Sequence, residues 1–299
     1  MIDAKGAQQH QRPDAMKTIL VPTEHNAEQG ASMLSALDTA LLLAQKFGSC
    51  IEGFPLRPAV ADMVAMDPDA GLTMVAVREN DAEMIRQAED LFRSFMERNG
   101  VQRRADENAT ASLSWSWLAS APSGHDFVGS YGRVFDMIVL SRPPEEWQSP
   151  AMVTLESALF ESGRPVLIAP PSSPRSLATN ILIAWNRSTE QARTMAFAMP
   201  LLRLAERVTI LTVEGATVAG PSGAEMARSL KANGIGAATI GATAGKVSAG
   251  EIILNKAEEL GCDLIIKGAY TQSRLRQMIF GGPTRHVLAH AKLPVLMAH

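Results

Sequence analysis

The chain repeats one arrangement of short apolar runs, and this internal repeat limits the possible folds more than any other feature. The runs form matched pairs: Lys17–Pro22 with Asn180–Ala184, Asp136–Leu140 with Asp263–Lys267, and Pro165–Ala169 with Pro294–Ala298. Such short apolar runs are typical of strands buried on both faces of a parallel sheet. Helical patterns lie between them, at 31–47, 79–98, 189–205, 223–233 and 250–260. This alternation predicts right-handed βαβ units, and therefore an α/β fold with two tandem doubly wound parallel five-stranded sheets.

The length of 299 residues fits two domains, because one domain holds roughly 150 residues. We predict a polar N-terminal tail at 1–16, a first domain at 17–171, a linker at 172–179 and a second domain at 180–299. The first domain carries extra residues after its second strand. We interpret this segment, 55–77, as an inserted loop or lid, with a plain surface loop as the simpler alternative.

Composition excludes several classes of function. The net charge is −3, so the molecule as a whole has no general attraction to nucleic acid or anionic membranes. Aromatic residues make up 5%, which leaves few rings for stacking unpaired bases. Two cysteines form no disulfide framework, no spacing resembles a zinc site, and no apolar run is long enough to span a bilayer. No secretory signal is visible, so we expect a cytoplasmic protein that binds neither nucleic acid nor membrane.

The charge is divided unevenly between the halves. Up to Ser172 the chain has 14 basic and 23 acidic residues, a net charge of −9. After Ser172 it has 14 basic and 8 acidic residues, a net charge of +6. Two interpretations remain open: the halves attract each other, or the second half binds an anion.

The candidate ligand site of the second half follows from a rule for open parallel sheets. Ligands bind beyond the carboxyl ends of the strands, where the strand order reverses, which selects the residues after Ala184, Thr212 and Lys267. The segment after Lys267 contains glycines, arginines and an expected helix N-terminus near Pro283, and all of these favour an anion. Its glycines and arginines are Gly268, Gly281, Gly282, Arg274, Arg276 and Arg285.

At this point the sequence resembles a known family. Residues 17–299 are similar to two universal stress protein domains fused in tandem. The resemblance rests on the opening run 181–188, the strand 263–268, the Gly281–Gly282 turn and the closing run 293–297. It implies a role in stress response and a Rossmann-like sheet in the order 3-2-1-4-5. It also implies that the last strands of two domains pair, which in a fused chain gives an internal pseudo-dimer. A further homodimer is compatible with this arrangement.

The nucleotide motif of the family is only partly present. Nucleotide-binding members carry Gly-x2-Gly-x9-Gly-[Ser/Thr] after strand four and an Asp after strand one. Gly268 and Gly281 match the first and third glycines, but Thr271 occupies the second position and resists positive φ. Gly282 replaces the hydroxyl residue, and Asn186 replaces the Asp.

The resemblance implies an adenine-nucleotide or anion site in the second half, with ATP as the expected ligand. Its residues would be Ala184, Trp185, Asn186, Val213, Gly268, Ala269, Thr271, Arg274, Gly281, Gly282 and Thr284. Three functions are compatible with this motif: a nucleotide-responsive stress protein, an interaction or chaperone-like module without nucleotide, and a slow ATPase. The departures from the motif favour the second, while Gly281 and the basic charge favour the first. The third lacks an obvious general base or magnesium ligand, so we do not expect an enzyme.

The first half lacks the glycines of this motif. Its matching loop is 141–147, in which two prolines have no N–H to donate and Glu145 and Glu146 would repel phosphate. We therefore expect the first half to complete the pseudo-dimer and not to bind a triphosphate. Glu24 and His25 follow its first strand and are interpreted as loop residues, with a remodelled pocket as the alternative.

Several other patterns have simpler explanations. The Gly-x2-Gly spacing at 129–132 precedes strand four, on the wrong side of the sheet, and 241–246 is too short for a phosphate-binding loop. His286 and His290 are interpreted as surface residues. Trp115 and Trp117 share one face of a strand and predict packing in the core or at the domain interface. Both cysteines are interpreted as buried small apolar residues.

Overall fold

The computed structural model describes the chain at residues 16–24, 30–57, 74–106, 110, 112–143, 150–269 and 282–299. The first half contains β1 (Thr18–Thr23), α1 (Gly30–Phe47), β2 (Cys50–Pro55), α3 (Met74–Arg98), β3 (Gln102–Arg103), β4 (Ser114–Trp117), α4 (Phe127–Tyr131), the 3-10 turn η1 (Gly132–Val134), β5 (Met137–Leu140), α5 (Pro150–Glu161) and β6 (Val166–Ile168). The second half contains β7 (Asn180–Ala184), α6 (Thr189–Leu202), β8 (Arg207–Glu214), α7 (Gly223–Ala232), β9 (Ala238–Thr243), α8 (Ala249–Glu259), β10 (Leu264–Ile266), α9 (Gly282–His290) and β11 (Val295–Met297).

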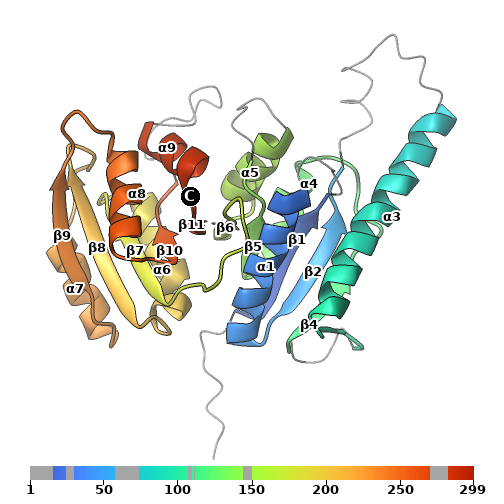
Figure 1. Cartoon of the computed structure of the whole chain (residues 1–299), viewed down its shortest axis with the longest axis horizontal. Coiled ribbons are helices and arrows are strands. Elements are labelled where there is room, and N and C mark those ends of the chain that lie inside the picture. The colour runs from blue at the N-terminus through green and yellow to red at the C-terminus, as the bar shows by residue number, and fades with distance from the viewer. Residues whose placement is uncertain are drawn as a thin grey trace, which may run out of the picture.

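The strand order confirms the tandem doubly wound fold. The sheet runs β3-β4-β2-β1-β5-β6-β11-β10-β7-β8-β9, so each half has the order 3-2-1-4-5 within itself. Strands β6 and β11 meet at the centre of the molecule (Figure 1), where Leu167 pairs with Leu296 in an antiparallel register. The expected pairing of the last strands is therefore confirmed, and it joins the two doubly wound sheets into one sheet of 11 strands. The short edge strand β3 is the extra strand of the first half.

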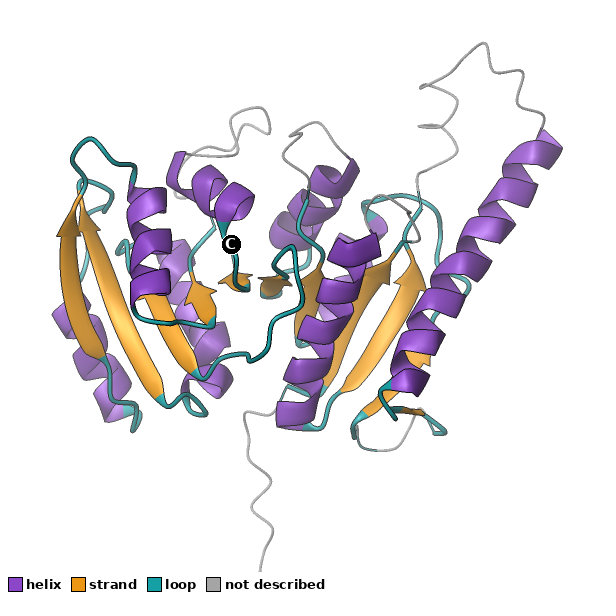
Figure 2. Cartoon of the chain, in the orientation of Figure 1, coloured by secondary structure: helices purple, strands orange, loops and turns teal. Residues whose placement is uncertain are grey.

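Helices cover both faces of the sheet in each half (Figure 2). The buried side chains form two clusters, one on each face. One cluster joins the sheet to α1, α3, α6 and α7, and the other joins it to α4, α5, α8 and α9. The short strands are buried throughout because helices cover both of their faces, as their continuous apolar sequences predict.

The matched aspartates of the repeat have a shared structural role. Asp136 Oδ2 accepts hydrogen bonds from the backbone N–H groups of Lys17 and Thr18, at 2.7 and 3.0 Å. Asp263 Oδ1 accepts equivalent bonds from Thr179 and Asn180, both at 2.9 Å. In each half, the carboxylate before strand four therefore fixes the start of strand one.

Two other sequence interpretations are confirmed. Trp115 is buried and packs edge-on against Phe92 of α3, with ring centroids 5.9 Å apart. The pair Trp115 and Trp117 thus belongs to the core under α3, not to the domain interface. At Gly129, a Cβ atom would lie 2.4 Å from Ser157 Oγ of α5, so close helix packing explains the Gly-x2-Gly spacing.

The predicted insertion at 55–77 is shorter at both ends than expected. Its first residue completes β2, and α3 already begins at Met74. Residues 58–73 lie outside the described residues.

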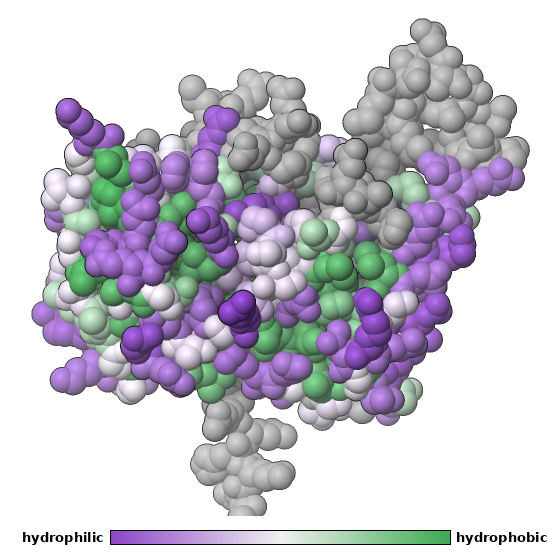
Figure 3. Space-filling model, viewed as in Figure 1, coloured by the Kyte–Doolittle hydropathy of each residue, from purple (hydrophilic) through white to green (hydrophobic). Residues whose placement is uncertain are grey.

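Hydrophilic side chains cover α3 along the outer edge of the molecule in the space-filling view (Figure 3). In the part of the chain that the structure describes, no helix is long and apolar enough to cross a membrane.

Candidate functional site

The strand order of the second half reverses between β7 and β10. These strands are parallel neighbours, with Leu182 opposite Ile265. Helix α6 follows β7 on one face of the sheet, and α9 follows β10 on the other. The connections therefore diverge at the carboxyl ends of β7 and β10, which is where ligands bind in such sheets.

The loop after β7 holds its own polar groups in place. Trp185 is buried, and its indole Nε1–H donates to the carbonyl of Pro221 at 2.8 Å. Asn186 Oδ1 accepts from the Ser188 N–H at 3.2 Å. Between them in the chain, Arg187 has a φ of 71°, a left-handed conformation that residues other than glycine rarely adopt. The side-chain oxygen of Asn186 and the indole N–H thus stabilise the loop itself.

Gly268 is in contact with the first turn of α6. Its N–H donates to Gln191 Oε1 at 2.6 Å. A Cβ atom at Gly268 would lie 2.5 Å from the backbone nitrogen of Gln191, too close for any side chain. The glycine after strand four is therefore required for helix–strand packing. Gln191 itself is fully buried, and its amide Nε2 has no hydrogen-bond partner among the residues that the structure describes.

Lys267 is the residue of this edge that sequence reasoning missed. It follows β10 directly and is buried, although it carries an ammonium group. Its Nζ donates to Thr284 Oγ1 at 2.7 Å and to the Gly268 carbonyl at 3.1 Å. Burial lowers the pKa of Lys267 to about 8. The signal was present in the sequence as a charged residue at the end of an otherwise apolar strand.

The position of Lys267 relative to α9 is electrostatically unfavourable on its own. Thr284 is the third residue of α9, so the ammonium lies beside the N-terminus of that helix. The helix macrodipole is positive at this end. Both partners of Nζ are neutral, and no carboxylate pairs with it among the described residues. A buried cation next to a positive helix end is the combination that a bound anion stabilises.

Some of the remaining residues expected from the sequence are described by the structure, and others lie outside the described residues. Ala184 and Val213 are buried at the carboxyl ends of β7 and β8, and Ala269 is buried and hydrogen-bonded to Ala298. Gly282 begins α9, with open space where a Cβ would lie. Thr271, Arg274 and Gly281 lie outside the described residues, so their place in the site stays a prediction. The short glycine segment at 241–246 begins inside strand β9.

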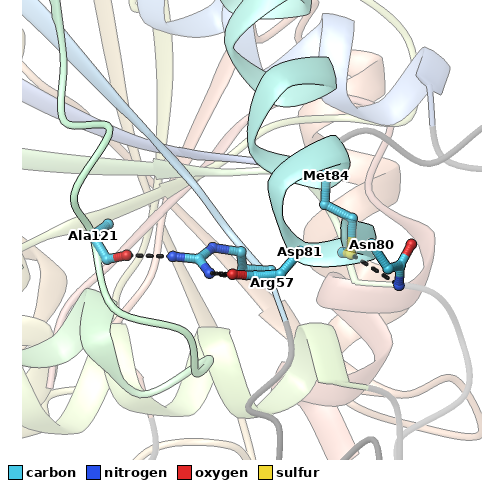
Figure 4. A network of polar contacts seen from close by, with 5 residues as sticks. All are labelled: Arg57, Asn80, Asp81, Met84 and Ala121. Carbon is cyan, nitrogen blue, oxygen red and sulfur yellow. Dashed lines mark hydrogen bonds and ion pairs between the residues drawn. The ribbon is translucent and has the colours of Figure 1, made fainter. Parts of the chain in front are cut away.

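The corresponding edge of the first half has different chemistry. Arg57, two residues after β2, is buried and forms an ion pair with Asp81 at 2.5 Å. Its second terminal nitrogen donates to the Ala121 carbonyl, also at 2.5 Å (Figure 4). Arg57 thus ties α3 and the chain at Ala121 to the end of β2. The carboxylate of Asp81 balances its charge, and its Nε is buried without a hydrogen-bond partner among the described residues.

The strand order defines the class of the protein: doubly wound α/β domains, here in tandem. Residues 178–299 match the sequence description of the universal stress protein family. Residues 178–299, which make up the second half, are therefore a universal stress protein domain. No match was found among curated proteins.

Two solved structures have similar folds over nearly the whole chain. One is a universal stress protein from Archaeoglobus fulgidus, with a TM-score of 0.66, 16% sequence identity, and coverage of 95% of this chain and 96% of that one. The other is a protein provisionally assigned as a universal stress protein from Pseudomonas aeruginosa, with a TM-score of 0.50, 17% identity, and coverage of 95% and 94%. These similarities extend the tandem fold to the first half.

Proposed function

We propose that this protein acts in a stress response and that its second half binds a phosphate-bearing anion, with ATP as the candidate drawn from the family resemblance. The family match of residues 178–299 supports the stress role. The observation that carries the anion site is the buried ammonium of Lys267 beside the N-terminus of α9. A phosphate oxygen there would accept from Lys267, Thr284 and helix N–H groups.

The contacts favour recognition of the phosphate end over the base. Asn186, at the family's Asp position, already accepts from Ser188, and the Gly268 N–H already donates to Gln191. Few polar groups among the described residues of this loop therefore remain to hold a ribose or adenine. We expect ATP to bind weakly, and tripolyphosphate to bind about as well as ATP.

Calorimetric titration with ATP, tripolyphosphate and adenosine tests this proposal. The first two should bind and adenosine should not. Lys267→Met should remove most of the binding, because the buried cation is lost. Lys231→Met is the matched control, since Lys231 is exposed on α7 and its loss should leave the affinity unchanged. Binding of adenosine alone, or equal affinities of Lys267→Met and wild type, would contradict the proposed site.

A second function is supported by the same loop contacts. Trp185, Asn186 and Gly268 all have partners inside the protein, as expected for an interaction module that binds no nucleotide. Absence of heat with both ATP and tripolyphosphate would favour this function. The sequence departure at Thr271 offers a further test: if it weakens a phosphate cradle, Thr271→Gly should tighten ATP binding.

A further inference from the structure

The first half has a half-buried cation at the edge where its strand order reverses. Arg142 lies two residues after β5. Its guanidinium Nε and Nη2 are buried, and neither has a hydrogen-bond partner among the residues that the structure describes. These two nitrogens form one edge of the planar guanidinium, the edge that binds a carboxylate through two parallel hydrogen bonds. Buried polar groups normally have partners, so this edge is prepared for a ligand oxyanion.

An acidic residue lies at the same edge of the sheet as this arginine. Strands β1 and β5 are parallel neighbours, with Leu20 opposite Ile138. Glu24 directly follows β1, and Arg142 lies two residues after β5. Both residues therefore lie at the carboxyl ends of two adjacent strands.

Glu24 and Arg142 do not neutralise each other. Burial raises the pKa of Glu24 and lowers the pKa of Arg142 to about 10. Burial is the cause of both shifts, and no attraction between opposite charges contributes to either. Arg57, which is buried at this edge, is already paired with Asp81 (Figure 4). The edge thus presents one acidic and one basic group, each without a partner in the described chain.

We propose that this edge of the first half binds a small zwitterion of the amino acid type. The carboxylate of the ligand lies on Nε and Nη2 of Arg142, and its ammonium group lies toward Glu24. Such a ligand supplies the missing charge to both groups at once, whereas a simple anion would leave Glu24 next to a second negative charge. A polyphosphate fits poorly, because Pro143 has no N–H to donate and Glu24 adds negative charge.

Glycine and its two half-ligands, acetate and methylamine, provide the test. The full-length protein is added to each 13C-labelled probe, and broadening of the probe signal by NMR reports binding. Glycine should bind more tightly than acetate, and methylamine should not bind. Arg142→Lys keeps the positive charge but loses the two parallel N–H donors of the guanidinium. It should therefore weaken glycine binding at least about tenfold, roughly 1.4 kcal/mol.

Two variants separate this proposal from a structural role of the arginine. Glu24→Gln should retain acetate binding and lose the preference for glycine. Arg98→Lys, a change on the exposed end of α3, should bind glycine like wild type. Circular dichroism checks that each variant is folded. Unbroadened glycine signals with wild type, or unchanged binding in folded Arg142→Lys, would overturn the proposal, and so would equal binding of acetate and glycine. The site lies in the first half, so loss of the Lys267 site would not affect this result.

Discussion

The buried ammonium of Lys267 should make the unfolding free energy depend on pH in a defined window. Burial lowers its pKa from 10.5 to about 8 in the folded protein. In the unfolded chain the side chain is hydrated and keeps its ordinary value. Between pH 8 and pH 10.5 the unfolded chain therefore binds more protons than the folded one. The unfolding free energy should rise with pH across this window, and below pH 8 the folded protein should carry the full penalty.

The magnitude follows from the same pKa values. A pKa lowered from 10.5 to about 8 corresponds to a penalty of about 3 kcal/mol for the charged form. Lys267→Met removes this penalty but also loses the bonds to Thr284 and the Gly268 carbonyl, worth about 1 kcal/mol each. We therefore expect the variant to be more stable than wild type by about 1 kcal/mol at neutral pH and less stable by about 2 kcal/mol once Lys267 is neutral in both states.

Urea unfolding at a series of pH values, followed by tryptophan fluorescence and circular dichroism, measures this difference. The unfolding free energy of Lys267→Met minus that of wild type should change sign between neutral and strongly alkaline pH. Lys231→Met, with its exposed side chain, is the control and should show little change in this difference. A difference for Lys267→Met that does not vary with pH would refute the electrostatic account of this residue.

Three further predictions follow from individual contacts. Gly268→Ala should lower the unfolding free energy by about 2 kcal/mol or more, because its Cβ would overlap the backbone of Gln191. Gly282→Ala should change the unfolding free energy little, because there is open space for its Cβ, and equal effects of the two variants in urea unfolding would contradict the packing argument. Asp136→Ala should lower it by roughly 2 kcal/mol through loss of the bonds to the start of β1, and an unchanged urea midpoint would exclude this role. Burial and the charge of Asp263 raise the pKa of the Cys262 thiol to about 11. At pH 8, iodoacetamide should therefore label Cys262 about 100-fold more slowly than a thiol with the ordinary pKa of 9.0. Mass spectrometry measures this rate, and a similar rate for both thiols would contradict the prediction.

The parts of the fold that the sequence predicted are those that depend on local pattern. The apolar runs around Ile138 and Ile265 indicated buried parallel strands because short, continuous apolar segments have few other stable arrangements. The matched positions Asp136 and Asp263 marked the repeat, and the structure shows that the carboxylates stabilise the start of strand one. The pairing of β6 with β11 was expected from the family resemblance and not from the strand sequences, because the sequence of a strand does not indicate which edge it will pair with.

The candidate site was harder to predict because its contacts join distant parts of the chain. Gly268 was selected for its freedom to approach a ligand, but it contacts Gln191, which lies 77 residues earlier in the sequence. Lys267 was overlooked because a lysine at a strand end is usually exposed. In the folded protein it is buried and donates to Thr284 of α9, which follows in the sequence. The roles of Gly268 and Lys267 therefore depend on tertiary contacts, which the residue types alone do not indicate.

The two halves place their unusual cations at related positions of the repeat. Lys267 directly follows β10, and Arg142 lies two residues after β5, the matching strand of the first half. In the second half the ammonium lies near the start of α9, where the helix macrodipole is also positive, so an anion is needed to stabilise it. In the first half the unpaired Nε and Nη2 of Arg142 are the groups that need an anionic partner. A cation at each edge thus supports ligand binding in each half, while Glu24 and Thr284 make the two edges suit different ligands.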